Sequence, residues 1–196
     1  MVENHLRATE FYHVSKIGVI RGFHPLLAAL VERWRLETHT FVLPVDEVTV
    51  TLEDVAHIFG LPINGEPVSG WTNSSNKSTA YAHAKYLPLL REFERIHTYS
   101  WGSACLAHLY RALYRASRYD TKEMDVPLNL LFVWVWERML CIAPIPRHTL
   151  PPAEIPVAMR WSHSEWTTSW LAKTVARFRH DIDYMQEVNI YGSCDS

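Results

Sequence analysis

Basic side chains recur at helical spacing in one short stretch of the chain. These residues, three or four positions apart, are His108, Arg111, Arg115 and Arg118. Such spacing places them on one helix face, with Tyr110 and Tyr114 on an adjoining face. Arginine binds phosphate and aromatic rings stack on bases, so this stripe is a candidate nucleic-acid contact. A solvated helix face is the simpler interpretation, because the formal net charge of -2 does not favour generic polyanion binding.

Eleven histidines and three cysteines make a metal site worth considering. Cys105 and His108 are three residues apart on a predicted helix and are close enough to share one ion. A structural zinc site needs about four ligands, however, and no second pair is evident. We therefore interpret Cys105 as a buried, unreactive thiol and Cys141 as another buried thiol. The sequence predicts neither a bound metal nor a catalytic nucleophile.

The chain contains eight tryptophans, an unusually high number. Four of them are expected to fill the core from helices: Trp34, Trp101, Trp134 and Trp136. Close to these tryptophans in the sequence, Arg35 or Arg138 is placed to pair with Glu37 or Glu137. Three more follow a proline-rich connector and alternate with polar residues: Trp161, Trp166 and Trp170. Both a core position and a partner interface stay open for these three.

Apolar periodicity and helix-ending residues predict a mainly α fold, a single helical domain with one small β-hairpin at about 38–51. Thr51 can cap a helix over 52–59, which Gly60 and Pro62 end. Another helix is predicted to start at about Pro25 and to extend about ten residues. Four more are predicted to cover residues 84–96, 101–117, 128–140 and 164–183. The 128–140 helix is apolar nearly all round and should be central.

No apolar run approaches the roughly 20 residues of a membrane-spanning helix, and no secretory signal is evident at residues 1–10. We therefore expect a soluble intracellular protein that does not use a membrane. Residues 72–79 are polar and are predicted to form a flexible link.

Three stretches carry a family resemblance. They are Trp34–Pro62, Tyr99–Arg111 and Trp134–Arg138, with Arg160-Trp161 as a weaker echo. In this order they resemble the plant mobile domain, a module also labelled aminotransferase-like. It occurs in the MAINTENANCE OF MERISTEMS family and in related transposon-encoded proteins. The resemblance covers most of the chain and implies one plant mobile domain over residues 1–196.

The resemblance implies a non-catalytic interaction module in the plant nucleus. Its implied roles are meristem maintenance and silencing of transposable elements, and its implied partner is a phosphatase-like nuclear protein. No import signal is evident, so the nuclear location comes from the resemblance alone. The alternative is a transposon-derived module that binds nucleic acid through residues 108–118.

The label aminotransferase-like raises the question of pyridoxal phosphate. This cofactor needs a Schiff-base lysine and a phosphate cup. The lysines are Lys16, Lys77, Lys85, Lys122 and Lys173, and none follows a glycine-rich or serine-rich loop. We predict no cofactor and no enzyme activity.

One departure from the family pattern lies at residues 73–84. Members of the family normally carry a sizeable helical segment there, so the short stretch looks like an internal deletion. This leaves open whether the domain is complete. Net folding stability is only about 5 to 15 kcal/mol even for intact domains. Because a segment against which the rest of the domain would normally pack is replaced here, we expect the chain to be only marginally stable.

Overall fold

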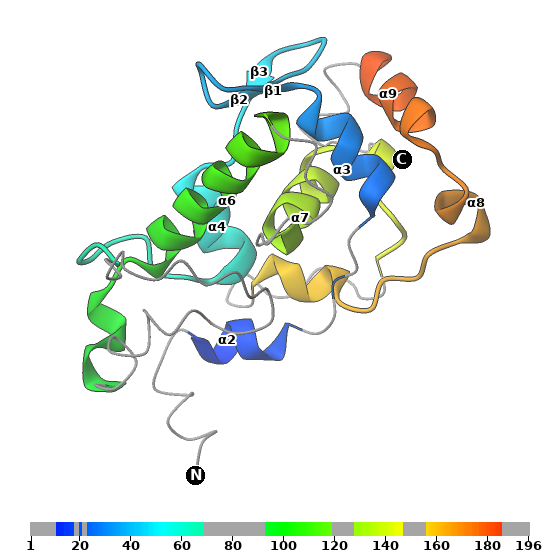
Figure 1. Cartoon of the computed structure of the whole chain (residues 1–196). Helices are drawn as coiled ribbons and strands as arrows, with labels where there is room; N and C mark the ends of the chain where they lie inside the picture. Colours follow the sequence, from blue (N-terminus) through cyan, green and yellow to red (C-terminus); the bar gives the residue numbers. More distant parts are fainter. Residues whose placement is uncertain are drawn as a thin grey trace.

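The computed structural model describes residues 11–17, 20, 23–68, 93–118, 128–146 and 156–185. The α-helices are α2 (Phe11–Lys16), α3 (His24–Val31), α4 (Leu52–Phe59), α6 (Trp101–Arg118), α7 (Leu128–Arg138), α8 (Thr168–Leu171) and α9 (Val175–Asp183). Three 3-10 helices are η2 (Phe93–Thr98), η3 (Leu140–Ile142) and η4 (Val157–Trp161). The mainly α fold with a small antiparallel sheet agrees with the sequence prediction (Figure 1).

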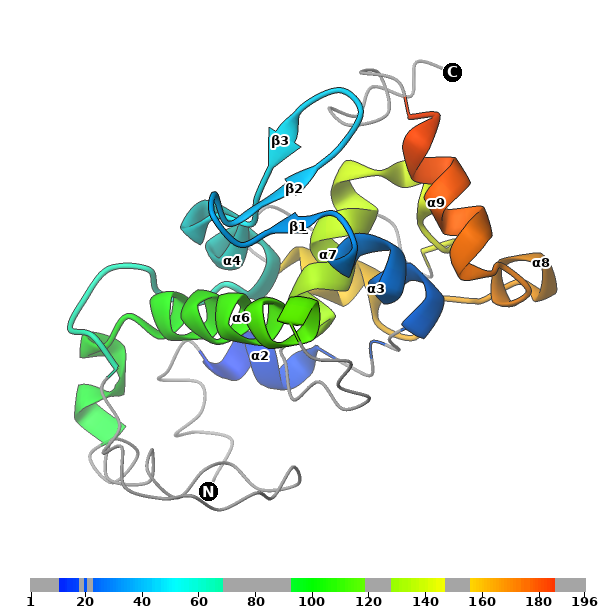
Figure 2. The same ribbon diagram turned by 45° about the horizontal axis from the view of Figure 1, so that its top comes forward.

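Helix α7 forms the centre of the core. Every side chain from Leu130 to Trp136 is at most 1% exposed. Helix α4 and the short helices η3 and η4 pack against α7, while α3 packs against α6 and α9 (Figures 1 and 2). A helix that is apolar on all sides must be covered on all sides, so the prediction of a central helix is confirmed.

The β-structure is larger than the predicted hairpin. Strands β1 (Trp34–Arg35), β2 (Thr40–Val42) and β3 (Glu47–Val48) form an antiparallel sheet in the order β1-β2-β3. The hairpin of β2 and β3 is confirmed, but Trp34 is a strand residue that pairs with Phe41. The expectation of a helical Trp34 was therefore wrong, because α3 ends at Val31 and the chain turns before β1.

Helix α4 begins and ends as the local sequence predicts. The Thr51 hydroxyl accepts a hydrogen bond from the Asp54 amide, and the Asp54 carboxylate accepts one from the Thr51 amide, at 3.2 and 2.8 Å. Gly60 ends the helix in the left-handed region, at φ 67°. This reciprocal capping satisfies two amides that have no partner within the helix.

The predictions for two other helices need correction. The helix predicted over 164–183 is two helices, α8 and α9, because the Thr174 side chain caps a new helix by accepting from the Arg177 amide. Residues 93–98 form the 3-10 helix η2, and the rest of the helix predicted at 84–96 lies outside the described residues. The predicted link at 72–79 and the departure at 73–84 also lie outside them.

Candidate functional site

The Asp54 carboxylate ties the start of α4 to α7. Besides capping α4, it accepts hydrogen bonds from Trp134 Nε1 at 3.0 Å and from Arg138 Nη2 at 2.6 Å. Trp134 and Arg138 are four residues apart and lie on the same face of α7. The Asp54 side chain is 13% exposed, so a charged group in this position needs these partners.

The Glu137 carboxylate makes a second connection, from α7 to η4. It accepts hydrogen bonds from the indole of Trp161 and from Arg160 Nη1, the latter at 3.4 Å. Trp136, the preceding residue, packs its ring against Trp161 with 5.3 Å between ring centroids. The stretches Trp134–Arg138 and Arg160-Trp161 are therefore joined in space. The polar groups that make these contacts, on Trp134, Glu137, Arg138, Arg160 and Trp161, hold helices together.

These contacts correct the ion pairs expected from sequence neighbours. Arg138 pairs with Asp54 rather than with Glu137. Arg35 pairs across the sheet with Glu47, at 3.5 Å, rather than with Glu37. In both cases the partner comes from another element, which sequence spacing cannot reveal.

The basic stripe on α6 differs from every other arginine site in the described part of the chain. Seven of the ten described arginines form an ion pair with a carboxylate: Arg33, Arg35, Arg95, Arg138, Arg160, Arg177 and Arg179. The three without one in the described structure are Arg111, Arg115 and Arg118. All three are exposed, and we call them the α6 arginine face.

The other predicted members of the stripe are placed differently. His108 is half-buried. The Tyr110 hydroxyl donates a hydrogen bond to the Val50 carbonyl at 2.8 Å and lies 2.9 Å from the Thr49 hydroxyl, so this residue anchors α6 to the chain before α4. Tyr114 is 39% exposed, and the Arg118 guanidinium lies over its ring, 4.8 Å from the centroid. One exposed ring therefore accompanies the α6 arginine face.

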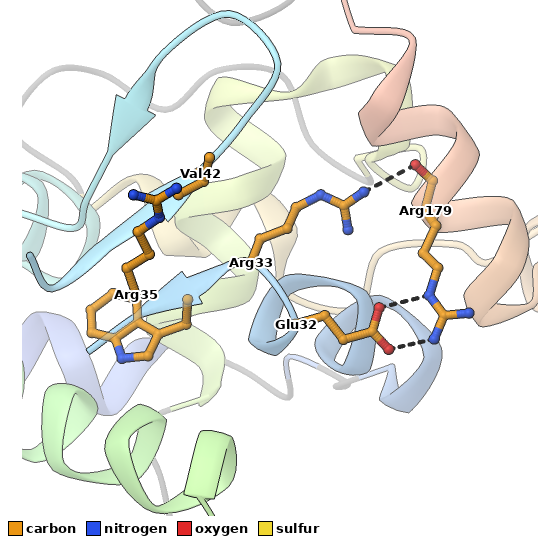
Figure 3. Close-up of a pocket in the computed structure, with 6 residues that line it drawn as sticks. Glu32, Arg33, Arg35, Val42 and Arg179 are labelled. Atoms are coloured by element: carbon orange, nitrogen blue, oxygen red, sulfur yellow. Dashed lines mark hydrogen bonds and ion pairs between the residues drawn. The ribbon is translucent and has the colours of Figure 1, made fainter. Parts of the chain in front are cut away.

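A pocket of about 450 Å³ opens between α3, the sheet and α9. Its lining residues are Glu32, Arg33, Trp34, Arg35, Val42 and Arg179. Figure 3 shows the Glu32 carboxylate facing the Arg179 guanidinium, while Arg35 extends beside Val42 and away from Arg179. Arg33 pairs with Asp183, one turn beyond Arg179 on α9. Each guanidinium of this pocket thus already has a carboxylate partner, and the Arg33–Asp183 and Arg179–Glu32 pairs hold α9 against the end of α3.

The structure also locates the tryptophans for which an interface was considered. Trp161 and Trp170 are 1% and 5% exposed and belong to the core, so the surface of the described structure does not present them to a partner. Trp166 is half-buried, and its indole packs against Trp170 at 4.9 Å between centroids. Partner contact at Trp166 stays a prediction. Trp34, Trp134 and Trp136 are in the core, and Trp101 is half-buried against it, as expected.

The cysteines differ in their surroundings. Burial raises the pKa of the Cys105 thiol to about 12, so it remains protonated at neutral pH. Cys141 was expected to be buried but is exposed. Among the described residues no group of three or more His, Cys, Asp or Glu side chains is arranged to hold a metal ion. No helix in the same part of the chain is long and apolar enough to cross a membrane.

Comparison with known proteins places the chain in a family. A family model described as Plant mobile domain matches residues 9–83 and 75–191. The chain is 34% identical to an Arabidopsis thaliana protein named Serine/threonine-protein phosphatase 7 long form homolog, over 65% of this chain and 14% of the relative. It is 30% identical to Protein MAIN-LIKE 1 and 26% identical to Protein MAINTENANCE OF MERISTEMS of the same plant, over 77% and 89% of this chain.

The chain spans less than half of each of these relatives, 42% of MAIN-LIKE 1 and 48% of MAINTENANCE OF MERISTEMS. The two alignments run over 217 and 237 positions, more than the 196 residues of this chain. These relatives therefore carry internal residues that have no counterpart here. The family model matches in two separate parts, which overlap at residues 75–83 of this chain, and this break supports the predicted internal deletion. No solved structure matches the chain.

Proposed function

Because the chain belongs to the plant mobile domain family, we propose that it acts as a non-catalytic interaction module in the plant nucleus. Its proposed roles are meristem maintenance and silencing of transposable elements. The name of the relative MAINTENANCE OF MERISTEMS supports the first role. The proposed partner is a phosphatase-like nuclear protein, and another relative carries a phosphatase name.

One observation carries this proposal, namely the different use of charge in the interior and on α6. The half-buried carboxylates of Asp54 and Glu137 are engaged in contacts between helices. Arg111, Arg115 and Arg118 instead leave their guanidinium groups exposed. Side chains that hold the fold together are thus separate from side chains available to a partner. This division is typical of a binding module on a rigid scaffold.

Affinity capture from plant nuclei tests the proposal. The tagged chain should enter the nuclear fraction and retain a defined protein partner after nuclease treatment, whereas the tag alone should not. Mass spectrometry would identify the partner and show whether it is phosphatase-like. Exclusion from nuclei, or loss of every bound protein on nuclease treatment, would contradict the proposal.

The second candidate is a transposon-derived module that binds nucleic acid through α6. Arg111, Arg115 and Arg118 are exposed and form no ion pair within the described structure, which favours this candidate, since phosphate contacts need available guanidinium groups. This candidate predicts that nuclease removes the captured material. It also predicts direct binding of a purified oligonucleotide that weakens steeply as salt increases.

A further inference from the structure

We propose that the α6 arginine face binds an acidic segment of a protein partner. The occupant would present three carboxylates at the spacing of one helix face, each paired with Arg111, Arg115 or Arg118. This inference rests on the proposed function, because it gives the partner's chemistry and the place where it binds. It adds a binding surface defined by charge.

The spacing of the three arginines makes this surface regular. They are four and three residues apart, so they lie along one side of α6 over roughly 10 Å, given a rise of about 1.5 Å per residue. Glutamates at matching intervals on a partner helix would face them in register. Guanidinium and carboxylate groups form paired hydrogen bonds, which give such a contact geometric specificity as well as attraction.

Nothing on α6 itself neutralises this charge. The helix contains no Asp or Glu from Trp101 to Arg118. In the described structure, arginines on the other elements pair with carboxylates even when they are more than half exposed, as Arg35 and Arg177 do. The α6 arginine face is therefore an exception among the arginines that the structure describes. The lack of a carboxylate partner for these three arginines within the described structure is the observation that indicates a ligand.

Stabilisation of the helix end explains only part of this pattern. Positive charge near a helix C-terminus interacts favourably with the helix dipole, but the effect is confined to about the last turn. Arg115 and Arg118 lie in the last turn, whereas Arg111 lies farther up the helix. The dipole gives no reason for a third arginine on the same face.

The surroundings favour a protein carboxylate over a nucleic acid. Nucleic-acid surfaces combine extended positive charge with rings that stack on bases. Here Tyr110 is held by Val50 and Thr49, which leaves Tyr114 as the one exposed ring on α6, and the Arg118 guanidinium already lies over it. The whole chain carries a formal charge of -2, which gives no long-range attraction for a polyanion. A short acidic segment needs neither stacking nor a wide basic surface.

Fluorescence anisotropy with defined probes tests the proposal. The probes are a labelled alanine-based helical peptide with three glutamates at the spacing of Arg111, Arg115 and Arg118, its twin with three glutamines, and single-stranded and duplex DNA of mixed sequence. The wild-type chain should bind the glutamate peptide more tightly than the glutamine peptide and more tightly than either DNA. Added salt should weaken the binding, because the contacts are exposed ion pairs.

The test variant combines Arg111→Gln, Arg115→Gln and Arg118→Gln. The matched control combines Arg35→Gln, Arg95→Gln and Arg177→Gln, which removes the same charge from exposed arginines elsewhere. The test variant should bind the glutamate peptide about tenfold more weakly, since it loses three exposed ion pairs that each contribute modestly. The control should keep the wild-type affinity. Circular dichroism of both variants should match that of the wild type.

Several outcomes would overturn the inference. Equal losses in the two variants would mean non-specific attraction, and tighter binding of DNA than of the glutamate peptide would establish the nucleic-acid alternative. Asp120, Glu123 and Asp125 follow α6 in the sequence and lie outside the described residues. Tighter peptide binding after these acids become amides would mean that the chain itself occupies the face.

Nuclear capture separates failure of this inference from failure of the proposed function. If the wild type and the Arg111, Arg115 and Arg118 variant retain the same nuclear partner equally well, the interaction module stands and the binding surface lies elsewhere. If the wild type retains no partner, the proposed function fails as well. Loss of the partner in the test variant alone, together with the peptide result, supports both.

Discussion

The Asp54 carboxylate lies 2.6 Å from a guanidinium nitrogen of Arg138, joining the first turn of α4 to the last turn of α7. The same carboxylate caps α4 and accepts the indole hydrogen of Trp134. One residue thus fixes where a helix begins and how it is seated on the central helix. The loss of its charge should affect both.

We predict that Asp54→Asn lowers the free energy of unfolding by about 2 to 4 kcal/mol. The amide keeps one acceptor oxygen but loses the charge, leaving Arg138 unpaired and weakening the cap. Urea unfolding followed by tryptophan fluorescence measures the change. Glu53→Gln is the control, since Glu53 is exposed in the same turn and should cost less than about 1 kcal/mol. Equal effects of the two changes would contradict the prediction.

We predict that Glu137 and Trp161 are energetically coupled. A double-mutant cycle with Glu137→Gln and Trp161→Phe should give a coupling free energy of about 1 kcal/mol or more. Either single variant removes the hydrogen bond from the Trp161 indole to a charged acceptor, and the double variant cannot lose it a second time. Trp166→Phe provides the control, since the Trp166 indole nitrogen is buried and has no hydrogen-bond partner among the described residues. Its combination with Glu137→Gln should be additive. Additivity of the Trp161 cycle would mean that the contact contributes no specific stability.

Local signals made the scaffold predictable. The Thr51 cap, the Gly60 end and the apolar pattern of α6 and α7 each depend on residues within a few positions, and all were confirmed. The order Arg111, Arg115, Arg118 likewise indicated an exposed basic stripe. The side chains of these arginines are exposed, as a stripe at that spacing requires.

Long-range partners could not be predicted in this way. Asp54 and Arg138 are 84 positions apart, and Tyr110 is 60 positions from Val50. The two-residue strand β1 is too short to show the alternation of a strand, and its pairing depends on β2. Trp161 and Trp170 alternate with polar residues like surface side chains, yet the core covers them. In each case the deciding contact comes from a distant element.

Gly65 should tolerate alanine poorly. It has φ 123°, and an added Cβ would lie 2.3 Å from the Thr98 carbonyl oxygen. That carbonyl accepts a hydrogen bond from the Glu66 amide, in the bridge that leads into α6. We expect Gly65→Ala to cost about 2 to 4 kcal/mol in urea unfolding.

Gly60→Ala is the matched control for Gly65→Ala. Gly60 has φ 67°, and its added Cβ would meet only ring atoms of Pro156, the nearest at 3.0 Å, and no backbone atom. It should cost about 1 to 2 kcal/mol, the typical penalty for a non-glycine residue in the left-handed region. A larger loss at Gly60 than at Gly65 would contradict the steric argument.

Acid should weaken the Glu32–Arg179 ion pair that joins the end of α3 to α9. The hydrogen bond from Arg179 lowers the pKa of Glu32 below its usual value of 4.5, although partial burial opposes the shift. A lowered folded-state pKa stabilises the fold above the unfolded-state value, and this contribution is lost as pH falls through the folded-state pKa. The urea midpoint of Glu32→Gln should lie slightly below that of the wild type near pH 7.

The difference in midpoint between wild type and Glu32→Gln should shrink below pH 4.5 and in high salt, since the Glu32 side chain is 43% exposed. Glu37→Gln serves as the control because Glu37 is also exposed and follows β1. If the difference in urea midpoint between wild type and Glu32→Gln grew in acid, its sign would contradict this ion pair.

Cys105 should resist alkylation in the folded chain. Its pKa of about 12 keeps the thiolate scarce at pH 8. Iodoacetamide should therefore modify the exposed Cys141 first and reach Cys105 only after unfolding in urea, as peptide mass spectrometry can measure. Because burial raises the folded pKa of Cys105 above the ordinary thiol value of 9.0, the native state should lose stability as pH rises from about 9 towards 12. Equal native labelling of both thiols would contradict the burial of Cys105.

The neighbouring positions of Glu137 and Arg138 constrain where this chain can change length. Glu137 connects to η4 and Arg138 connects to α4, in different directions from successive residues of one helix. One residue inserted into or removed from α7 would rotate everything beyond it by about 100° and misalign both connections. Neither connection involves residues between Val68 and Phe93. Evolution can therefore shorten or lengthen that stretch while the spacing that seats α4 and η4 on α7 is inherited unchanged.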